Sequence, residues 1–179
     1  MQGVARNCVR LLPHDPAWAE EFNTVKAELL AMHGENAVCV EHIGSTAIVG
    51  ICAKPILDIL LVVRSMDRLD KEAMTAVGYD DRGMQPPELT RRLFVLRSTD
   101  DLSLRHIHCC TDGEPEIERY LAFRDYLNAH PEDAKAYEAL KKTLAERYAG
   151  DRPSYTAGKH AFITDICSRA KTSTAQRSV

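Results

Sequence analysis

The chain has 179 residues, of which 45% are hydrophobic and 27% charged, and this usage excludes a disordered, collagen-like or fibrous protein. Its length suits a single domain of ordinary size. The formal net charge of −3 gives no general positive field, so we expect a small-molecule or nucleotide ligand and no long nucleic acid.

The first third of the chain predicts one helix followed by two strands. A helix is expected from Asp15 to Gly34, because a capping residue and a proline open it and apolar side chains recur at helical spacing. Residues 37–43 are β-branched and predict a short strand. Residues 55–63 are apolar on both faces, which indicates a strand at the centre of a sheet.

The middle of the chain predicts a second helix and two further strands. Ser65 is expected to cap a helix that Gly78 closes, and strands are expected at residues 93–97 and 104–110. Residues 80–87 are rich in turn-forming residues and predict a mobile loop beside these strands.

From residue 114 onward the pattern is helical, with helices expected at residues 114–130, 131–150 and 154–169. Residues 171–179 are polar and predict a disordered tail. We therefore predict one α+β (α/β) domain over residues 1–170, a sheet with flanking helices and a helical C-terminal half.

Asp58 is the most informative residue, because it lies in the otherwise apolar run 55–63. An unpaired carboxylate buried in such a run is costly, so we expect Asp58 to be paired, protonated, metal-bound or at the open end of the strand. The favoured interpretation is a catalytic carboxylate that binds metal or transfers a proton. A salt bridge to an arginine or a capped helix end is the alternative.

Gly44, Ser45 and Thr46 follow the first predicted strand and predict a turn that holds an anion. A glycine lets the backbone approach a ligand, and N–H groups and hydroxyls can then face a phosphate. Ser and Thr are also ordinary helix caps, so the turn alone is a weak signal. Lys54 is expected to add a positive charge near Asp58.

His106 and His108 are two residues apart in a predicted strand, so they share a face. Two imidazoles on one face suit a metal or a phosphate better than a dry core, and both are candidates for a catalytic role. The alternative is one core histidine and one solvent-facing histidine. His42 is a further candidate metal ligand, although the sequence does not fix the face on which it lies.

Several basic residues are candidates for phosphate contacts, and we expect Arg92, Arg124 and Lys159 to be among them, although most arginines here are ordinary surface charges. Lys159 shares a helix face with Tyr155, four residues earlier. Lys141 is instead expected on the outward, solvated face of its helix.

Other features narrow the class of protein. No nucleophile-elbow, P-loop or dinucleotide-binding glycine motif occurs, which disfavours acyl-enzyme hydrolases, P-loop kinases and Rossmann dehydrogenases. The six cysteines include no C-x-x-C pair, no apolar run is long enough for a bilayer, and the first residues lack a secretory layout. We expect reduced thiols, a cytoplasmic location and no membrane partner.

The segments Glu41–Ala47 and Ala53–Ile59 resemble the GrpB-like family of the nucleotidyltransferase superfamily. The likeness extends to Val9–Trp18, His106–His108 and Phe123–Pro131, and so covers nearly the whole chain. The resemblance implies a nucleotidyltransferase-like fold with a mixed sheet, in a family whose members occur alone or fused to dephospho-CoA kinase.

In the wider superfamily, the resemblance implies, a Gly-Ser turn holds the phosphates of an NTP, and two carboxylates in an Asp-x-Asp arrangement hold Mg²⁺ with a third from another strand. Gly44 and Ser45 match the turn, and Asp58 matches the first carboxylate. Leu60 stands at the second position, and the later strand carries histidines. One Asp with imidazoles suits Mn²⁺, Zn²⁺ or a single weakly held Mg²⁺.

These features predict a metal-dependent transferase that moves a nucleotidyl or phosphoryl group from an NTP to a small acceptor. One alternative is a non-catalytic nucleotide- or anion-binding module of the same fold, which Leu60 favours. Another is a metal-assisted hydrolase that uses the three histidines and Asp58. The sequence does not indicate the acceptor, the base preference or the oligomeric state.

Overall fold

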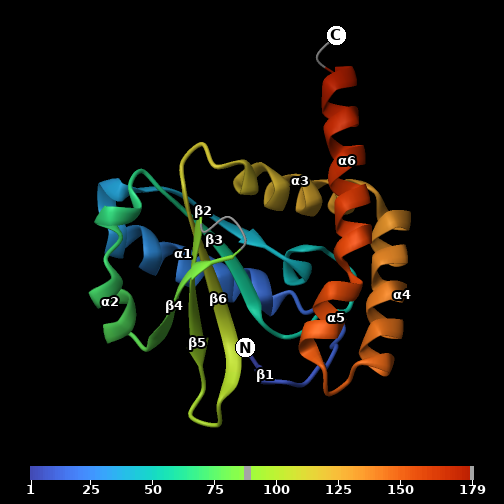
Figure 1. Cartoon of the computed structure of the whole chain (residues 1–179), viewed down its shortest axis with the longest axis horizontal. Helices are drawn as coiled ribbons and strands as arrows, with labels where there is room; N and C mark the ends of the chain where they lie inside the picture. The colour runs from blue at the N-terminus through green and yellow to red at the C-terminus, as the bar shows by residue number, and fades with distance from the viewer. Residues whose placement is uncertain (87–89, 178–179) are drawn as a thin grey trace.

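The computed structural model describes residues 1–86 and 90–177 and contains a mixed six-stranded sheet with helices on both faces (Figure 1). The strand order is β2-β3-β6-β5-β4, with β1 paired to β6. The β3–β6 pair is parallel and the other pairs are antiparallel. The strands are β1 (Val4–Ala5), β2 (Ala37–Ile43), β3 (Leu57–Val63), β4 (Tyr79–Gln85), β5 (Arg91–Arg97) and β6 (Leu102–Thr111).

The helices divide into an N-terminal pair and a C-terminal group, as Figure 1 shows. Short 3₁₀ turns η1 (Gly34–Asn36), η2 (Ser45–Ala47) and η3 (Met66–Arg68) connect the elements of the first half. The α-helices are α1 (Ala17–His33), α2 (Lys71–Ala76), α3 (Pro115–Ala129), α4 (Pro131–Arg147), α5 (Arg152–Gly158) and α6 (His160–Arg177).

One face of the sheet packs against α1 and α2. Alternate residues of β3, among them Leu57 and Ile59, meet Trp18 and Leu29 of α1 and Met74 of α2 in one buried cluster. The period of two along the strand and the helical spacing along α1 place these side chains on facing surfaces. The predicted amphipathic first helix and central strand are confirmed.

The opposite face packs against the C-terminal helices. Leu60 and Val62 of β3 and Cys110 of β6 form a small cluster, against which Tyr120 of α3 packs. A neighbouring cluster joins the loop after η2 to α3, α4 and α6. Asp58 projects from this same face of β3, since side chains two residues apart share a face. The predicted α+β class is confirmed.

Residues 80–85, which we expected in a mobile loop, form most of β4. The strand pairs with β5 and is anchored by the buried ring of Tyr79. Its register shifts between Asp81 and Met84, around Gly83 at φ 70°, and this irregularity explains why the segment reads as a turn in the sequence. Pro87 lies outside the described residues.

Three helix boundaries also differ from expectation. Asp70, not Ser65, caps α2 by accepting a hydrogen bond from the backbone N–H of Ala73 at 2.8 Å. The last predicted helix is two helices, α5 and α6, which meet at Lys159. Helix α6 continues to Arg177, into the predicted tail, because residues 171–177 contain neither glycine nor proline. Residues 178 and 179 lie outside the described part.

Among the described residues, none of the helices combines the length and the apolar character that crossing a bilayer requires.

Candidate functional site

Asp58 and His106 lie opposite each other on the parallel strands β3 and β6. Oδ1 of Asp58 is 3.0 Å from Nδ1 of His106 and 3.6 Å from Nε2 of His108. The three candidate ligand atoms all lie within 4.8 Å of one another. The structure thus brings together the three residues that the sequence predicted as the centre of the site.

The two imidazoles keep Asp58 ionised. Burial opposes the charged form of this carboxyl, but hydrogen bonds from His106 and His108 outweigh burial and hold its pKa well below the usual range. Burial lowers the pKa of His108, an effect that Asp58 partly opposes. Nδ1 of His108 is buried with no hydrogen-bond partner in the described part of the chain.

Gly44 allows the turn after β2 to touch Asp58. Its φ is 72° and its ψ is −168°, a conformation that side chains rarely permit, and a Cβ here would lie 2.6 Å from Oδ2 of Asp58. Ser45 follows in η2, and its hydroxyl donates to the hydroxyl of Tyr137 at 3.4 Å. Glycine is therefore needed at residue 44 because of the carboxylate behind it.

Three cations surround this carboxylate. Burial lowers the pKa of Lys54 to about 7 and also lowers the pKa values of Arg152 and Lys159, while Asp58 opposes the change in all three. A guanidinium nitrogen of Arg152 lies 3.5 Å from Nε2 of His106, and both lysine ammonium groups lie over the ring of Tyr155. No carboxylate forms an ion pair with any of the three within the described residues, so positive charge exceeds negative charge here.

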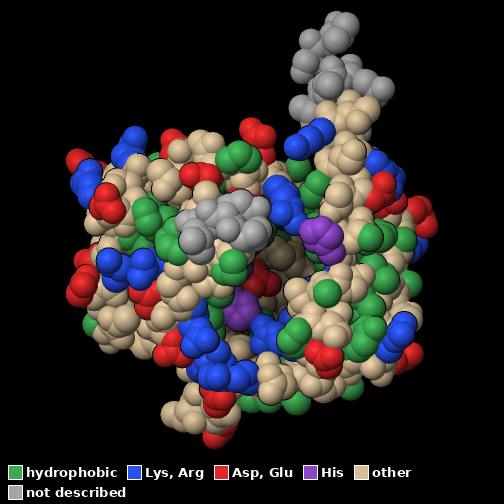
Figure 2. Space-filling model, in the orientation of Figure 1, with side chains coloured by type: hydrophobic (Ala, Val, Ile, Leu, Met, Phe, Trp, Pro, Cys, Tyr) green, Lys and Arg blue, Asp and Glu red, His purple; other side chains and the backbone are tan. Residues whose placement is uncertain are grey.

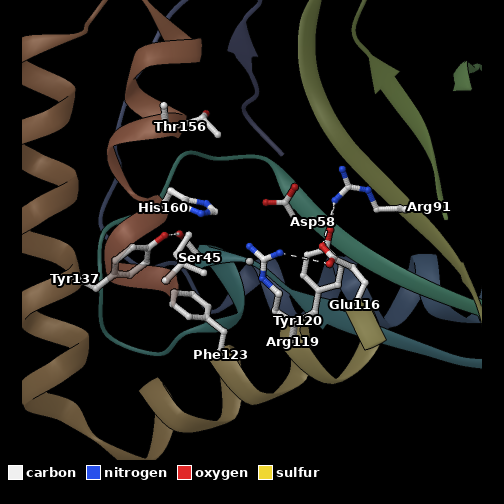
Figure 3. A pocket seen from close by; sticks show the side chains of 13 residues that line it. Ser45, Asp58, Arg91, Glu116, Arg119, Tyr120, Phe123, Tyr137, Thr156 and His160 are labelled. Atoms are coloured by element: carbon white, nitrogen blue, oxygen red, sulfur yellow. Dashed lines mark hydrogen bonds and ion pairs between the residues drawn. The ribbon is translucent and has the colours of Figure 1, made fainter. Parts of the chain in front are cut away.

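The residues around Asp58 open into a cleft of about 680 Å³ between the sheet and the C-terminal helices, which we call the main cleft. Figure 2 shows this hollow, with His and acidic side chains inside it and Lys and Arg side chains gathered along its lower rim. In Figure 3, Asp58 and Arg91 approach from the sheet, and Tyr137, Phe123 and His160 approach from the helices. One end is therefore polar and charged, and the other is aromatic.

A band of ion pairs crosses the main cleft between its two ends. Glu116 of α3 accepts from Arg119 at 3.4 Å and lies 3.7 Å from Arg91 of β5. Arg91 also donates to the hydroxyl of Tyr120. These contacts connect β5 to α3 and fix the width of the main cleft.

The donor atoms at Asp58, His106 and His108 fit one divalent ion. One carboxylate oxygen and two imidazole nitrogens suit Mn²⁺ or Zn²⁺ better than Mg²⁺, which prefers oxygen ligands. No second carboxylate joins the cluster among the described residues, so these residues do not supply the acidic set of a two-metal centre. The three neighbouring cations weaken the hold on a bare ion, whereas phosphate oxygens would strengthen it.

His42 is not part of this cluster, so the four-ligand set with His42 is wrong. His42 pairs with Ile59 on β3, on the α1 side of the sheet, where it stacks on Phe22 with ring centroids 5.0 Å apart. Its Nε2 lies 2.9 Å from the hydroxyl of Thr46, which is buried and does not line the main cleft. Neighbouring residues of a strand point to opposite faces of the sheet, so His42 faces away from the side that carries Asp58. The sequence alone did not show which face His42 occupies.

Arg92 and Arg124, both predicted to contact phosphate, are engaged elsewhere. Arg92 points away from Asp58 and forms an ion pair of 2.5 Å with Asp81, whereas its neighbour Arg91 lines the main cleft. Arg124 donates to Glu41 at 2.7 Å and to the backbone carbonyl of His42 at 3.0 Å. The prediction for Arg92 was wrong by one residue, because neighbouring residues of a strand point to opposite faces of the sheet.

Lys141 is fully buried, although we expected it on an outward helix face. Its ammonium donates to the backbone carbonyl of Cys52 and lies 4.7 Å from the ring centre of Tyr137. The helix α4 is covered on this side by the loop between η2 and β3, which the helix pattern alone does not reveal.

Sequence reasoning missed Arg152, Tyr137 and His160 as residues of the site. Arg152 follows an N-cap aspartate and precedes a proline, a signal of a separate short helix that would have brought it beside Lys159. No local pattern distinguishes Tyr137 from an ordinary core tyrosine.

Comparison with known proteins gives a family. The family model described as GrpB protein matches residues 8–169. UPF0157 protein YqkA of Bacillus subtilis (strain 168) is 38% identical over 165 residues, which cover 91% of this chain and 47% of that protein. A dephospho-CoA kinase of Mycolicibacterium paratuberculosis is 30% identical over 191 residues, which cover 93% of this chain and 47% of the kinase. The chain spans about half the length of these two relatives.

Two solved structures have the same fold. The crystal structure of conserved protein GrpB from Enterococcus faecalis has a TM-score of 0.82 at 34% identity and covers 90% of this chain and 96% of that chain. The Cid1 poly(U) polymerase with MgGTP bound has a TM-score of 0.54 at 16% identity and covers 82% of this chain and 50% of that chain. The second likeness concerns the fold alone, and it confirms the predicted nucleotidyltransferase-like architecture.

Proposed function

The chain belongs to the GrpB family, and from this membership and the geometry of the main cleft we propose that it binds a nucleoside triphosphate and transfers a nucleotidyl or phosphoryl group to a small acceptor. The observation that carries the proposal is the meeting of Asp58 and the Gly44–Ser45 turn in one cleft, with three basic side chains close enough for the charge of Asp58 to act on them.

The basic side chains near Asp58, which lie behind the lining of the main cleft, suit a triphosphate. No described carboxylate forms an ion pair with Lys54, Arg152 or Lys159, although the charge of Asp58 acts on all three. Phosphate oxygens would accept hydrogen bonds from these cations. The turn at Gly44 and Ser45 can approach the phosphates closely, since residue 44 has no side chain. Taken together these groups stabilise the negative charge that develops on a leaving pyrophosphate.

The aromatic end of the main cleft suits a nucleobase. Phe123 and Tyr137 meet edge to face with ring centroids 5.2 Å apart, and His160 faces them across the opening. Aromatic rings bind bases of any sequence by stacking. A nucleotide lying along the main cleft would then have its phosphates at Asp58 and its base at α3, α4 and α6.

In nucleotidyl transfer, an acceptor hydroxyl oxygen would attack the α-phosphorus, the bond from that phosphorus to the bridging oxygen would break, and pyrophosphate would leave while the hydroxyl proton passes to water. Asp58, His106 and His108 would hold a divalent ion, which supplies charge neutralisation at the phosphates when bound. Lys54 and Lys159 would hold the phosphates, and the Asp58–His106 hydrogen bond orients this imidazole in the chain without the ion.

The test uses purified chain with each of the four common NTPs, Mn²⁺ or Mg²⁺ and a panel of small acceptors. We expect release of pyrophosphate, or of a nucleoside diphosphate for phosphoryl transfer, and loss of at least about 99% of the rate in Asp58→Asn. Asp67→Asn, at an exposed aspartate in η3, is the matched control and should be unaffected. No release with any acceptor and no nucleotide binding by calorimetry would reject the proposal.

A second candidate is a nucleotide-binding module without chemistry. Leu60 favours it, because this side chain is fully buried in the apolar cluster under α3 at the position where the superfamily arrangement has a second carboxylate. Nucleotide binding that persists after chelation of metal, with no product in the assay above, would select this candidate over the enzyme.

A further inference from the structure

A second, smaller pocket of about 380 Å³ lies on the other side of His106 from the main cleft. Five elements or their flanking residues meet there, namely β1, β4, β5, β6 and α5. Four guanidinium groups line this pocket, which we call the arginine pocket, and none of its described lining residues is acidic; the four are Arg6, Arg82, Arg97 and Arg152.

The carboxylates near the arginine pocket do not neutralise it. Arg97 lies 3.4 Å from Asp80 and 3.6 Å from Asp101, and Arg6 lies 3.6 Å from the same Asp101. Both acids are more than half exposed, with side-chain exposures of 55% and 59%, so they lie at the outer rim where solvent weakens the pairs.

The remaining two arginines have no acidic partner among the described residues. Arg82 is exposed on β4 and its side chain enters no described ion pair, and Arg152 lies 3.5 Å from Nε2 of His106, with Asp58 acting on it through its charge alone. Four like charges drawn together from separate parts of the chain repel one another, and a bound anion removes that repulsion. Converging guanidinium forks match the oxygens of a phosphate group.

The arginine pocket adjoins the charged end of the main cleft. Thr156 lines both cavities. His106 lines the arginine pocket, and it hydrogen-bonds Asp58, which lines the main cleft. A molecule held in the arginine pocket would therefore present its other end to the place where the phosphates of a nucleotide are proposed to lie.

We infer that the arginine pocket binds the phosphate group of the acceptor, so that the acceptor is a small phosphomonoester with a free hydroxyl. This inference rests on the proposed function, since it assigns the second substrate of the same site. The small volume suits a short phosphorylated molecule and not a polymer, and four cations suit a dianion better than a single carboxylate.

The test is calorimetric titration of the full chain with glycerol 3-phosphate at low ionic strength, with and without a saturating non-hydrolysable ATP analogue. Glycerate, which carries a carboxylate in place of the phosphate, is the comparison ligand. We expect glycerol 3-phosphate to bind in both conditions and at least about tenfold more tightly than glycerate.

Arg82→Gln is the informative variant, because Arg82 is exposed and its loss leaves the fold intact. We expect it to weaken glycerol 3-phosphate binding about tenfold and to leave ATP-analogue binding within about twofold. Arg97→Gln should behave in the same way. Arg68→Gln, at an exposed arginine of η3 that lines neither cavity, is the matched control and should change neither affinity.

Each contrary result has a distinct meaning. Absence of glycerol 3-phosphate binding, or equal binding of glycerate, overturns the inference. Competition between glycerol 3-phosphate and the ATP analogue, with both weakened by Arg82→Gln, assigns the arginine pocket to the triphosphate and also overturns it. Failure of the ATP analogue to bind rejects the proposed function separately, because the phosphate titration does not need the nucleotide.

Discussion

Gly44 and Asp58 are in such close contact that only a hydrogen atom fits between the backbone of one and the carboxylate of the other. A Cβ on residue 44 would lie 2.6 Å from Oδ2 and 2.9 Å from Cβ of Asp58. The anion-binding turn and the acidic residue of the site are therefore one structural unit, and a change at either displaces both.

Gly44→Ala should lower the free energy of unfolding by about 2–3 kcal/mol, since the residue keeps φ 72° and meets Asp58. Gly50→Ala is the matched control, because φ there is 80° but nothing lies within 4 Å of the added Cβ. It should cost only about 1 kcal/mol. Urea denaturation measures both, and equal losses would show that the contact with Asp58 is unimportant.

Leu60→Asp should destabilise the fold by on the order of 3 kcal/mol and should not raise any transferase rate. The side chain of Leu60 is fully buried against Val62 and Cys110, so a carboxylate there has no partner. Leu60→Met, which keeps the volume, should cost less than about 1.5 kcal/mol. A stable, more active Leu60→Asp protein would mean that residue 60 faces the bound nucleotide.

His42 should make the fold sensitive to mild acid. Burial lowers its pKa from 6.5 to about 4, with Arg124 adding to the effect and Asp58 opposing it. Between these values the unfolded chain binds more protons than the folded chain, so stability present above pH 6.5 is lost as the pH falls toward 4. The loss from pH 7 to pH 5 should be on the order of 1–2 kcal/mol.

The measurement compares urea unfolding of the native chain and His42→Gln at pH 7 and pH 5. The variant should lose less stability on acidification. His160→Gln, at an exposed histidine of α6, is the control, and it should lose as much stability between pH 7 and pH 5 as the native chain. An unchanged pH dependence in His42→Gln would show that another group is responsible.

Lys141 should resist amine-reactive reagents in the folded protein. Burial lowers its pKa to about 7, which raises the share of the reactive neutral amine, but its nitrogen is fully buried and held against the carbonyl of Cys52 under Tyr137, out of reach of a reagent. Peptide mass spectrometry should find it modified at least about tenfold more slowly than exposed Lys142, with the difference lost in denaturant. Comparable rates in the folded state would place Lys141 at the surface, as its helix pattern suggests.

The elements with strong periodicity were predictable, and so was the centre of the site. Helix α1, strand β3 and the shared face of His106 and His108 follow from spacing alone, because burial imposes those periods. Strand β4 was missed because its pairing with β5 outweighs its turn-forming residues, which only a tertiary contact can reveal.

The periphery of the site was less predictable. His42 and Arg92 lie on the side of the sheet away from Asp58. The side on which a residue lies follows from the strand register, and the register depends on partner strands elsewhere in the chain. Arg152 is part of the site because α5 and α6 are separate helices, and the break between them lets α5 lie against the sheet. Charge clusters formed by distant segments leave no local signature.

The parallel pairing of β3 with β6 has a kinetic consequence. Asp58 and His106 are 48 residues apart in the chain, and Arg152 lies 46 residues beyond His106. Closing such long loops costs entropy before the contacts repay it, so these contacts form late. A partly synthesised chain that ends before α5 can contain all six strands and Lys54, yet it lacks Arg152 and Lys159. Two of the three cations near Asp58 are therefore added only when the last helices fold.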